Sequence, residues 1–140
     1  MRELFLVAAV ICFGMAAIKF YTARMSRNPP ARPKPASDKY LTLTAEEAKA
    51  RLDEDDGIIL LDVRTQAEYD GGHIPGAVCL PNEDISASLP LPFDKDAEIL
   101  VYCRSGRRSA KAAEKLADMG FAYVADFGGI LNWPYETTTD

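Results

Sequence analysis

Two short apolar runs limit the possible folds of this 140-residue chain more than any other feature. Residues 58–63 read IILLDV and residues 98–103 read EILVYC, and neither run alternates apolar with polar residues. A strand with one face in water alternates, whereas an unbroken apolar strand is covered on both faces. Such strands are typical of parallel sheets, whose connections place helices on both faces. We therefore expect an α/β fold with an open parallel sheet flanked by helices on both faces.

The segments around these runs supply the helices and the remaining strands. Residues 44–47 read TAEE, a capping box with Thr44 as the N-cap, and predict a helix that ends near residue 53. A second helix is expected over residues 109–119, with Gly120 as its C-terminal stop. Short helical turns are expected at residues 66–70, 85–88 and 130–135, and further strands at residues 40–43, 77–80 and 121–126.

Charge divides the chain into a basic start and an acidic remainder. Residues 1–37 hold six lysines and arginines against one acidic residue, a net charge of +5. The remaining residues hold ten basic and twenty acidic side chains, a net charge of −10. An acidic body argues against nucleic acid as a partner, because phosphate backbones attract basic surfaces. The split indicates a basic tether attached to an acidic domain.

The N-terminal segment is apolar enough to suggest a membrane anchor. Residues 4–18 carry no charge, but this run is shorter than the roughly 20 residues that cross a bilayer. Lys19 can snorkel toward the interface, and the aromatic residues that follow it extend the usable length to Tyr21. We predict a hydrophobic helix over residues 1–24, as a transmembrane anchor or an uncleaved signal segment, that binds the membrane.

Two alternatives to the anchor differ in what they imply about location. A cleaved signal peptide stays open, although a clean small-x-small cleavage site is lacking. A lipid-anchored Cys12 is disfavoured, because Ile11 precedes it where a small residue is expected. Basic residues gather after the apolar run, so the positive-inside rule favours a cytoplasmic catalytic domain. With a signal peptide the domain would instead be periplasmic or secreted.

A proline-rich stretch separates the apolar segment from the folded part. Four prolines lie within residues 26–37, and each fixes φ and lacks a backbone donor. The stretch therefore predicts an extended, semi-rigid spacer. We divide the chain into the anchor, a Pro-rich basic linker over residues 25–38, a folded domain over residues 39–136 and a tail over residues 137–140.

Cys103 ends the second apolar run, and a polar loop and a helix follow it. Ligands of parallel α/β sheets bind beyond the carboxyl ends of the strands, where Cys103 is expected. The reactive form of cysteine is the thiolate, and a free thiol has a pKa of about 8.5. The helix start and a tight turn at Ser105-Gly106 can direct backbone amides at the sulfur, and three arginines within five residues add positive charge. The pattern predicts a nucleophile.

The other two cysteines do not join a common site. Cys12, Cys79 and Cys103 lack the short paired spacings of metal and redox sites. Because their number is odd, at least one thiol is unpaired. We expect Cys79 to be a small hydrophobic core residue, and Cys12 the same within the apolar segment. Trp133 is interpreted as a core residue.

Three stretches resemble signatures of the rhodanese family. Residues 103–109 (CRSGRRS) are similar to its active-site loop, and residues 60–77 (LLDVRTQAEYDGGHIPGA) to its upstream signature. Residues 127–133 (FGGILNW) are similar to its Gly-Gly…Trp segment. The three follow the family's order and spacing over about residues 40–135. The resemblance implies a rhodanese-like fold and a sulfurtransferase in which Cys103 carries sulfur as a persulfide.

The resemblance also implies a ping-pong reaction and assigns its residues. A small sulfur-containing anion such as thiosulfate, or a persulfide, gives its sulfane sulfur to Cys103, and a thiol or cyanide removes it. His73 would belong to a structural turn, and Asp62 and Arg64 are expected to brace the loop and pair with Glu68. Neither a metal nor an organic cofactor is implied, and no protein partner is identified. The residues expected to bind the substrate are Arg104, Ser105, Gly106, Arg107, Arg108 and Ser109.

Two other functions are alternatives to sulfur transfer. One is phosphatase or arsenate reductase activity. Cysteine-dependent phosphatases hold phosphate in a loop of Cys, five residues and Arg. Here Ser109 takes the arginine's place and Arg108 lies one residue earlier, so the shorter loop favours a sulfur atom over phosphate. The second alternative is a membrane-tethered interaction or sulfur-relay module with little small-molecule turnover, because fold alone does not establish catalysis.

Overall fold

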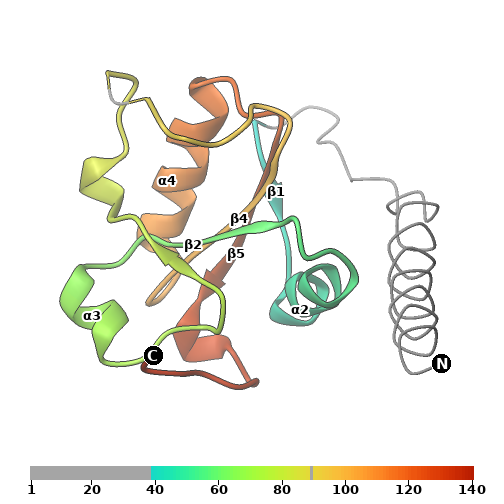
Figure 1. Cartoon of the computed structure of the whole chain (residues 1–140), viewed down its shortest axis with the longest axis vertical. Coiled ribbons are helices and arrows are strands. Elements are labelled where there is room, and N and C mark those ends of the chain that lie inside the picture. Colours follow the sequence, from blue (N-terminus) through green and yellow to red (C-terminus); the bar gives the residue numbers. More distant parts are fainter. Residues whose placement is uncertain (1–38, 89) are drawn as a thin grey trace, which may run out of the picture. The chain divides into compact units, whose positions relative to one another are not determined.

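The computed structural model describes residues 39–88 and 90–140. The predicted anchor and linker lie outside these residues and stay predictions. Five parallel strands form one sheet in the order β1-β5-β4-β2-β3, with β4 in the middle (Figure 1). The strands are β1 (Leu41–Thr42), β2 (Ile59–Asp62), β3 (Val78–Cys79), β4 (Glu98–Cys103) and β5 (Tyr123–Gly129). The predicted parallel α/β sheet is confirmed.

Helices cover both faces of the sheet, as the unbroken apolar strands predicted. Helix α2 (Ala45–Glu54) lies on one face and α4 (Arg107–Asp118) on the other, while the short α3 (Gln66–Asp70) follows β2 (Figure 1). Every residue of β4 is buried. Leu60 and Leu61 of β2 point to opposite faces, Leu60 into the core beside α2 and Leu61 into the core beside α4.

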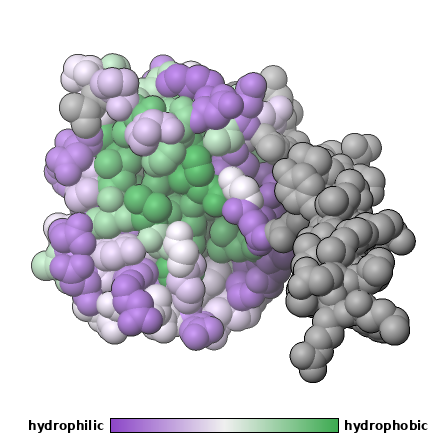
Figure 2. All heavy atoms as spheres, viewed as in Figure 1, coloured by the Kyte–Doolittle hydropathy of each residue, from purple (hydrophilic) through white to green (hydrophobic). Residues whose placement is uncertain are grey.

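The core beside α4 continues to the surface through partly buried apolar residues. Figure 2 shows a central apolar area on one face of the domain, framed by hydrophilic residues. Residues packed against this core include Ile59, Leu80, Leu91 and Phe93.

In the part of the chain that the structure describes, no helix combines the length and the apolar character that a membrane crossing requires.

The predicted helix starts depend on capping groups, and one of them differs from expectation. The capping box of α2 is confirmed, because the Glu47 amide lies 3.1 Å from Thr44 Oγ1 and the Thr44 amide lies 2.8 Å from the Glu47 carboxylate. Helix α4 begins at Arg107, two residues before the predicted start. Gly106 takes a left-handed conformation (φ +101°), which turns the chain from the loop directly into the helix.

Three shorter segments also differ from expectation. The helical turn predicted at residues 85–88 is wrong. A 3₁₀ helix lies at Asn82–Asp84 instead, directly after Pro81, and Ile85 is extended and buried in the core. The helical piece predicted at residues 130–135 is reduced to a 3₁₀ helix at Ile130–Asn132, and β5 extends to Gly129. The turn predicted at residues 85–88 does not form because Ile85 is buried in the core. Its local preference for a helical turn is weaker than the gain from packing its side chain there.

Candidate active site

Cys103 is the last residue of β4, and its sulfur lies inside the loop that follows. The Gly106 amide donates to Cys103 Sγ at 3.0 Å, and Ser109 Oγ lies 3.5 Å from the same sulfur. Only 1% of the residue is exposed. The loop therefore closes around the sulfur, as the Ser105-Gly106 turn predicted. The structure brings residues 103, 106 and 109 together at one point.

The groups around the sulfur favour its ionised form. Burial raises the pKa of Cys103, but the Ser109 hydroxyl and the backbone amides of Ser109, Gly106 and Ser105 outweigh burial and hold the pKa below its ordinary value. The amides and the hydroxyl are thus the main stabilising groups for a thiolate here. Their convergence on one atom is what an anion-binding nest requires.

Ser109 can change its hydrogen bond with the charge on the sulfur. Its hydroxyl carries one proton, yet Oγ lies 3.5 Å from Cys103 Sγ, 3.1 Å from the Gly106 carbonyl and 3.3 Å from the Gly128 carbonyl. With a neutral thiol, the S–H can donate to Oγ while the hydroxyl donates to a carbonyl. With a thiolate, the hydroxyl proton can turn to the sulfur. Sequence reasoning placed Ser109 in the loop but gave its hydroxyl no such role.

Because Gly129 has no side chain, the end of β5 can pack closely against the backbone of the active-site loop. A Cβ at Gly129 would lie 2.1 Å from the Arg104 carbonyl oxygen and 2.6 Å from Ser105 Cα. A Cβ at Gly106 would lie 3.3 Å from Gly128 Cα. The end of β5 therefore packs directly against the loop backbone. No such contact was predicted for Gly128-Gly129, although two adjacent residues without side chains are a signal of close backbone approach.

The guanidinium of Arg108 is paired with Glu68 and is therefore not free to bind a substrate. The guanidinium makes two hydrogen bonds with Glu68, at 2.8 and 2.9 Å. The hydrogen bonds from Arg108 hold the pKa of Glu68 near 2. The same carboxylate caps α3, because the Thr65 amide lies 3.0 Å from Glu68 Oε2. Arg104 and Arg107 are exposed.

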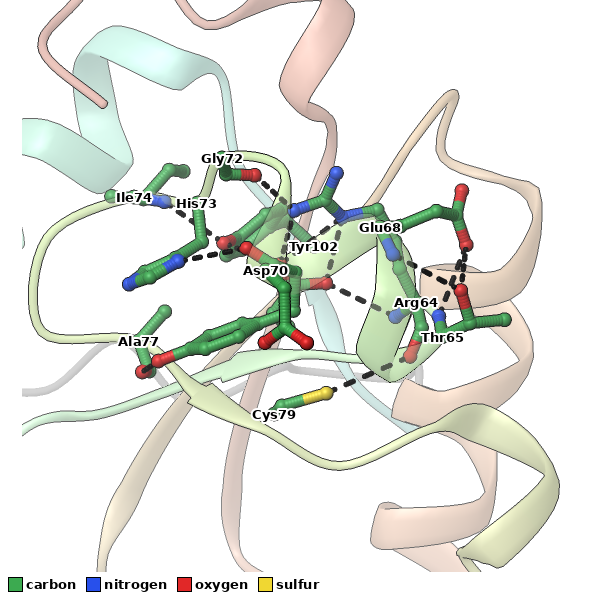
Figure 3. Close-up of polar contacts among 12 residues, drawn as sticks. Arg64, Thr65, Glu68, Asp70, Gly72, His73, Ile74, Ala77, Cys79 and Tyr102 are labelled. Carbon is green, nitrogen blue, oxygen red and sulfur yellow. Dashed lines mark hydrogen bonds and ion pairs between the residues drawn. The ribbon is translucent and has the colours of Figure 1, made fainter. Parts of the chain in front are cut away.

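Asp62 and Arg64 form a buried network instead of contacting the sulfur. The pairing expected between Arg64 and Glu68 is wrong, because Arg64 forms an ion pair with Asp62. Tyr102 donates to Asp62 at 2.8 Å and accepts from the Ile74 amide at 3.0 Å. Arg64 also donates to the Gly72 carbonyl at 2.7 Å, so the network fixes the turn after α3 (Figure 3). Because Tyr102 precedes Cys103, the network braces the end of β4.

His73 is built into the same turn. Its Nδ1 lies 2.9 Å from the Tyr69 carbonyl oxygen, and its ring stacks on the Tyr69 ring with centroids 3.7 Å apart. Its backbone exchanges two hydrogen bonds, each 2.8 Å long, with Thr138 in the segment expected to be a tail. These contacts agree with a structural role for the imidazole.

Cys79 differs from the core residue that was expected. The side chain is partly exposed and belongs to neither core cluster, and its neighbour Val78 is 51% exposed. Its sulfur lies 3.9 Å from the Arg64 carbonyl oxygen (Figure 3). Burial, with the nearby Asp62 carboxylate, raises the pKa of Cys79. By contrast, Trp133 is 9% exposed and packs in the core beside α2, as expected.

Comparison with known proteins settles the family. The model of the rhodanese-like domain matches residues 44–134. The chain belongs to the rhodanese-like domain family. A sulfurtransferase of Allochromatium vinosum is 36% identical over 92 residues, which cover 65% of this chain and 85% of that protein. The family expected from the three motifs is confirmed.

A second relative and a solved structure support the same assignment. The thiosulfate sulfurtransferase PspE of Escherichia coli is 36% identical over 74 residues, which cover 50% of this chain and 68% of that protein. The crystal structure of the Alr3790 protein from Anabaena sp. superimposes with a TM-score of 0.63 at 30% identity, over 69% of this chain and 79% of that one. Sulfur transfer is the chemistry that both named relatives share. The rhodanese-like match begins at residue 44, so the anchor over residues 1–24 stays a prediction.

Proposed function

We propose that this rhodanese-like domain is a sulfurtransferase in which Cys103 accepts a sulfane sulfur and passes it to a thiophilic acceptor. One observation carries the proposal: the sulfur of Cys103 lies inside a ring of amides that, with the Ser109 hydroxyl, lowers its pKa. A larger thiolate fraction at neutral pH makes this sulfur a better nucleophile and a better leaving group.

The first half-reaction loads the enzyme. The Cys103 thiolate attacks the outer sulfur of thiosulfate, a new S–S bond forms, and the S–S bond of the donor breaks. Sulfite leaves with the electron pair, and Cys103 becomes a persulfide. With a persulfide donor the leaving group is a thiolate. The exposed guanidinium groups of Arg104 and Arg107 suit an anionic donor, and the polar amides of residues 105–109 hold negative charge near the sulfur.

The second half-reaction unloads it. An acceptor thiolate or cyanide attacks the outer sulfur of the persulfide, and the S–S bond to Cys103 breaks. The electron pair returns to Cys103, and the amides and Ser109 stabilise the departing thiolate by the same contacts that stabilise the free enzyme. A site that stabilises one charge state serves both half-reactions.

The decisive experiment follows the mass of the intact protein. Treatment with thiosulfate or a polysulfide is expected to add one sulfur atom at Cys103, and cyanide is expected to remove it. Replacement of Cys103 by Ser should abolish the adduct and turnover, whereas replacement of Cys79 by Ser should leave both. If the Cys103→Ser protein still turned over, the assignment would be wrong. Loading without measurable turnover on any of thiosulfate, glutathione persulfide and mercaptopyruvate would favour the relay module.

The predicted anchor implies that the protein is attached to a membrane. The apolar run at residues 4–18 and the basic residues after it support attachment to a membrane with the domain on the cytoplasmic side. Membrane fractionation of the full chain tests attachment, and protease protection in sealed vesicles tests the side. The intact mass shows whether the N-terminal segment is cleaved, which would favour a signal peptide.

A further inference from the structure

The basic residues of the domain divide into those with a partner and those without one. Residues 39–140 contain ten lysines and arginines. Within the described residues, seven of them make an ion pair or a hydrogen bond: Lys39, Lys49, Arg51, Arg64, Lys95, Arg108 and Lys115. Arg104, Arg107 and Lys111 make neither with any described residue, and all three are exposed. Cations held by no partner are free to bind one.

These three cations lie in the active-site loop and on the first turns of the helix that follows it. Arg104 lies in the loop directly after Cys103, and Arg107 is the first residue of α4. Lys111 lies four residues further along α4, so it shares a face of the helix with Arg107 about 6 Å along the axis. The next residue on this face is Glu114, whose carboxylate lies 3.6 Å from Lys39 Nζ. The unpaired cations therefore end at Lys111.

An exposed apolar side chain lies beside the same loop. Leu131 is 65% exposed, and its amide donates to the Arg104 carbonyl at 3.2 Å. Large hydrophobic side chains with more than half of their surface in water are uncommon in this domain: among the described residues only Val78 and Leu131 are exposed to that extent. An apolar group next to unpaired cations is typical of a surface that contacts a protein.

We propose that Arg104, Arg107, Lys111 and Leu131 form a docking surface for an acidic protein segment that carries the thiol or persulfide exchanged with Cys103. The proposal rests on the proposed function, because it names the class of partner that exchanges sulfur. The rest of the domain is strongly acidic and would repel such a segment. The unpaired cations of the loop and of the first turns of α4 reverse the sign of the charge on this part of the surface and would orient the segment toward Cys103.

The length of the surface favours a protein segment over a small anion. An anion small enough to react at Cys103 can meet Arg104 and Arg107, but Lys111 lies a further helical turn from the loop. A segment of several residues with acidic side chains spans this distance and can also contact Leu131. In the transfer step the partner's thiolate attacks the outer sulfur of the Cys103 persulfide. The new S–S bond forms on the partner, and Cys103 leaves as a thiolate.

The test compares three synthetic peptide thiols of equal length as acceptors from Cys103 persulfide. One carries Asp and Glu beside its cysteine, one carries Ser and Asn, and one carries Lys. We expect the acidic peptide to react on the order of tenfold faster than the neutral one at low salt, with the advantage shrinking as ionic strength rises. The full chain is loaded first, and each rate is normalised to the loaded fraction of Cys103.

Two matched charge reversals locate the effect. Lys111→Glu should remove most of the preference for the acidic peptide, and Arg107→Glu/Lys111→Glu should reverse it in favour of the Lys peptide. Lys39→Glu makes the same change in net charge at the other end of α4 and should keep the preference. Equal rates for the three peptides, or equal loss in the Lys39→Glu protein, would overturn the docking surface. Failure of Cys103 to load at all would instead count against the proposed function.

Discussion

Cys103 and Cys79 each end a strand of the same sheet, yet their surroundings act on sulfur in opposite directions. The pKa of Cys103 is lowered although the residue is 1% exposed, whereas the pKa of the more exposed Cys79 is raised. Burial alone would predict the reverse order, because desolvation disfavours a thiolate. The difference must come from the polar groups that each sulfur meets.

The backbone after each cysteine explains the contrast. After Cys79, the Leu80 amide donates to the Asp62 carbonyl and the Asn82 amide to the Val63 carbonyl, while Pro81 has no amide hydrogen. These donors are used to extend the sheet. After Cys103, the left-handed Gly106 turns the amides inward, toward the sulfur. The pKa of a strand-end cysteine is therefore lowered here where the following amides are released from the sheet.

The largest expected effect tests the support of that loop. In Gly129→Ala, the new Cβ would lie 2.1 Å from the Arg104 carbonyl oxygen, so the loop must move and the amides must leave the sulfur. We expect persulfide loading to fall by about a hundredfold, as from loss of an oxyanion-hole donor. Gly71→Ala is the matched control, because a Cβ there meets only ordinary contacts at 3.6 Å. Normal loading in the Gly129→Ala protein would contradict the role given to this glycine.

The next effect compares the two sulfurs in one protein. At neutral pH we expect iodoacetamide to modify Cys103 at least about tenfold faster than Cys79, because a lower pKa gives a larger thiolate fraction. The ratio should shrink as pH rises, since Cys79 then ionises as well. Peptide mapping by mass spectrometry reads each cysteine separately. A faster reaction at Cys79 at neutral pH would show that access, and not ionisation, controls reactivity.

A smaller effect isolates the hydroxyl group of Ser109. Ser109→Ala removes one of the groups that lower the pKa of Cys103, so the pH–rate curve for loading should move to higher pH. At neutral pH we expect a loss of several-fold to about tenfold, the range of one pKa unit. Ser86→Ala, which removes an exposed hydroxyl 3.0 Å from Ser88 Oγ, is the control. An unshifted curve would leave the backbone amides as the only stabilising groups.

The smallest effect concerns the ion pair that holds the loop from outside. Glu68→Gln weakens the contact with Arg108 and should slow loading by about threefold. A change of about threefold corresponds to the small free energy that exposed ion pairs contribute to stability. The stability difference from the native protein has a defined pH window. Because the folded pKa of Glu68 is near 2, below its ordinary value of 4.5, the stabilisation is full above pH 4.5 and is lost as pH falls toward 2. Denaturation at several pH values measures it.

Local patterns in the sequence were enough for the parts of the fold that depend on neighbouring residues. The strand predicted at residues 98–103 has the same bounds as β4, and the capping box at Thr44 begins α2 as expected. Contacts between distant residues were predicted less well. Arg108 pairs with Glu68, 40 residues away, while Arg64 pairs with the nearby Asp62. Several carboxylates lie near each arginine in the sequence, and the sequence alone does not show that α3 brings Glu68 to Arg108 or that Arg64 turns back to Asp62.

The family was determined by the sequence, because three motifs follow the family's order and spacing, and the sequence also predicts Cys103 as the reactive cysteine. The ionisation of that cysteine was decided by tertiary structure. It depends on Gly129 of β5 packing against Arg104 and Ser105, a contact between segments that meet only in the folded chain, and on the turn that brings the Ser109 hydroxyl to the sulfur. Apolar patterns determine which surfaces are buried, whereas the position of one hydrogen-bond donor within an ångström requires the whole fold.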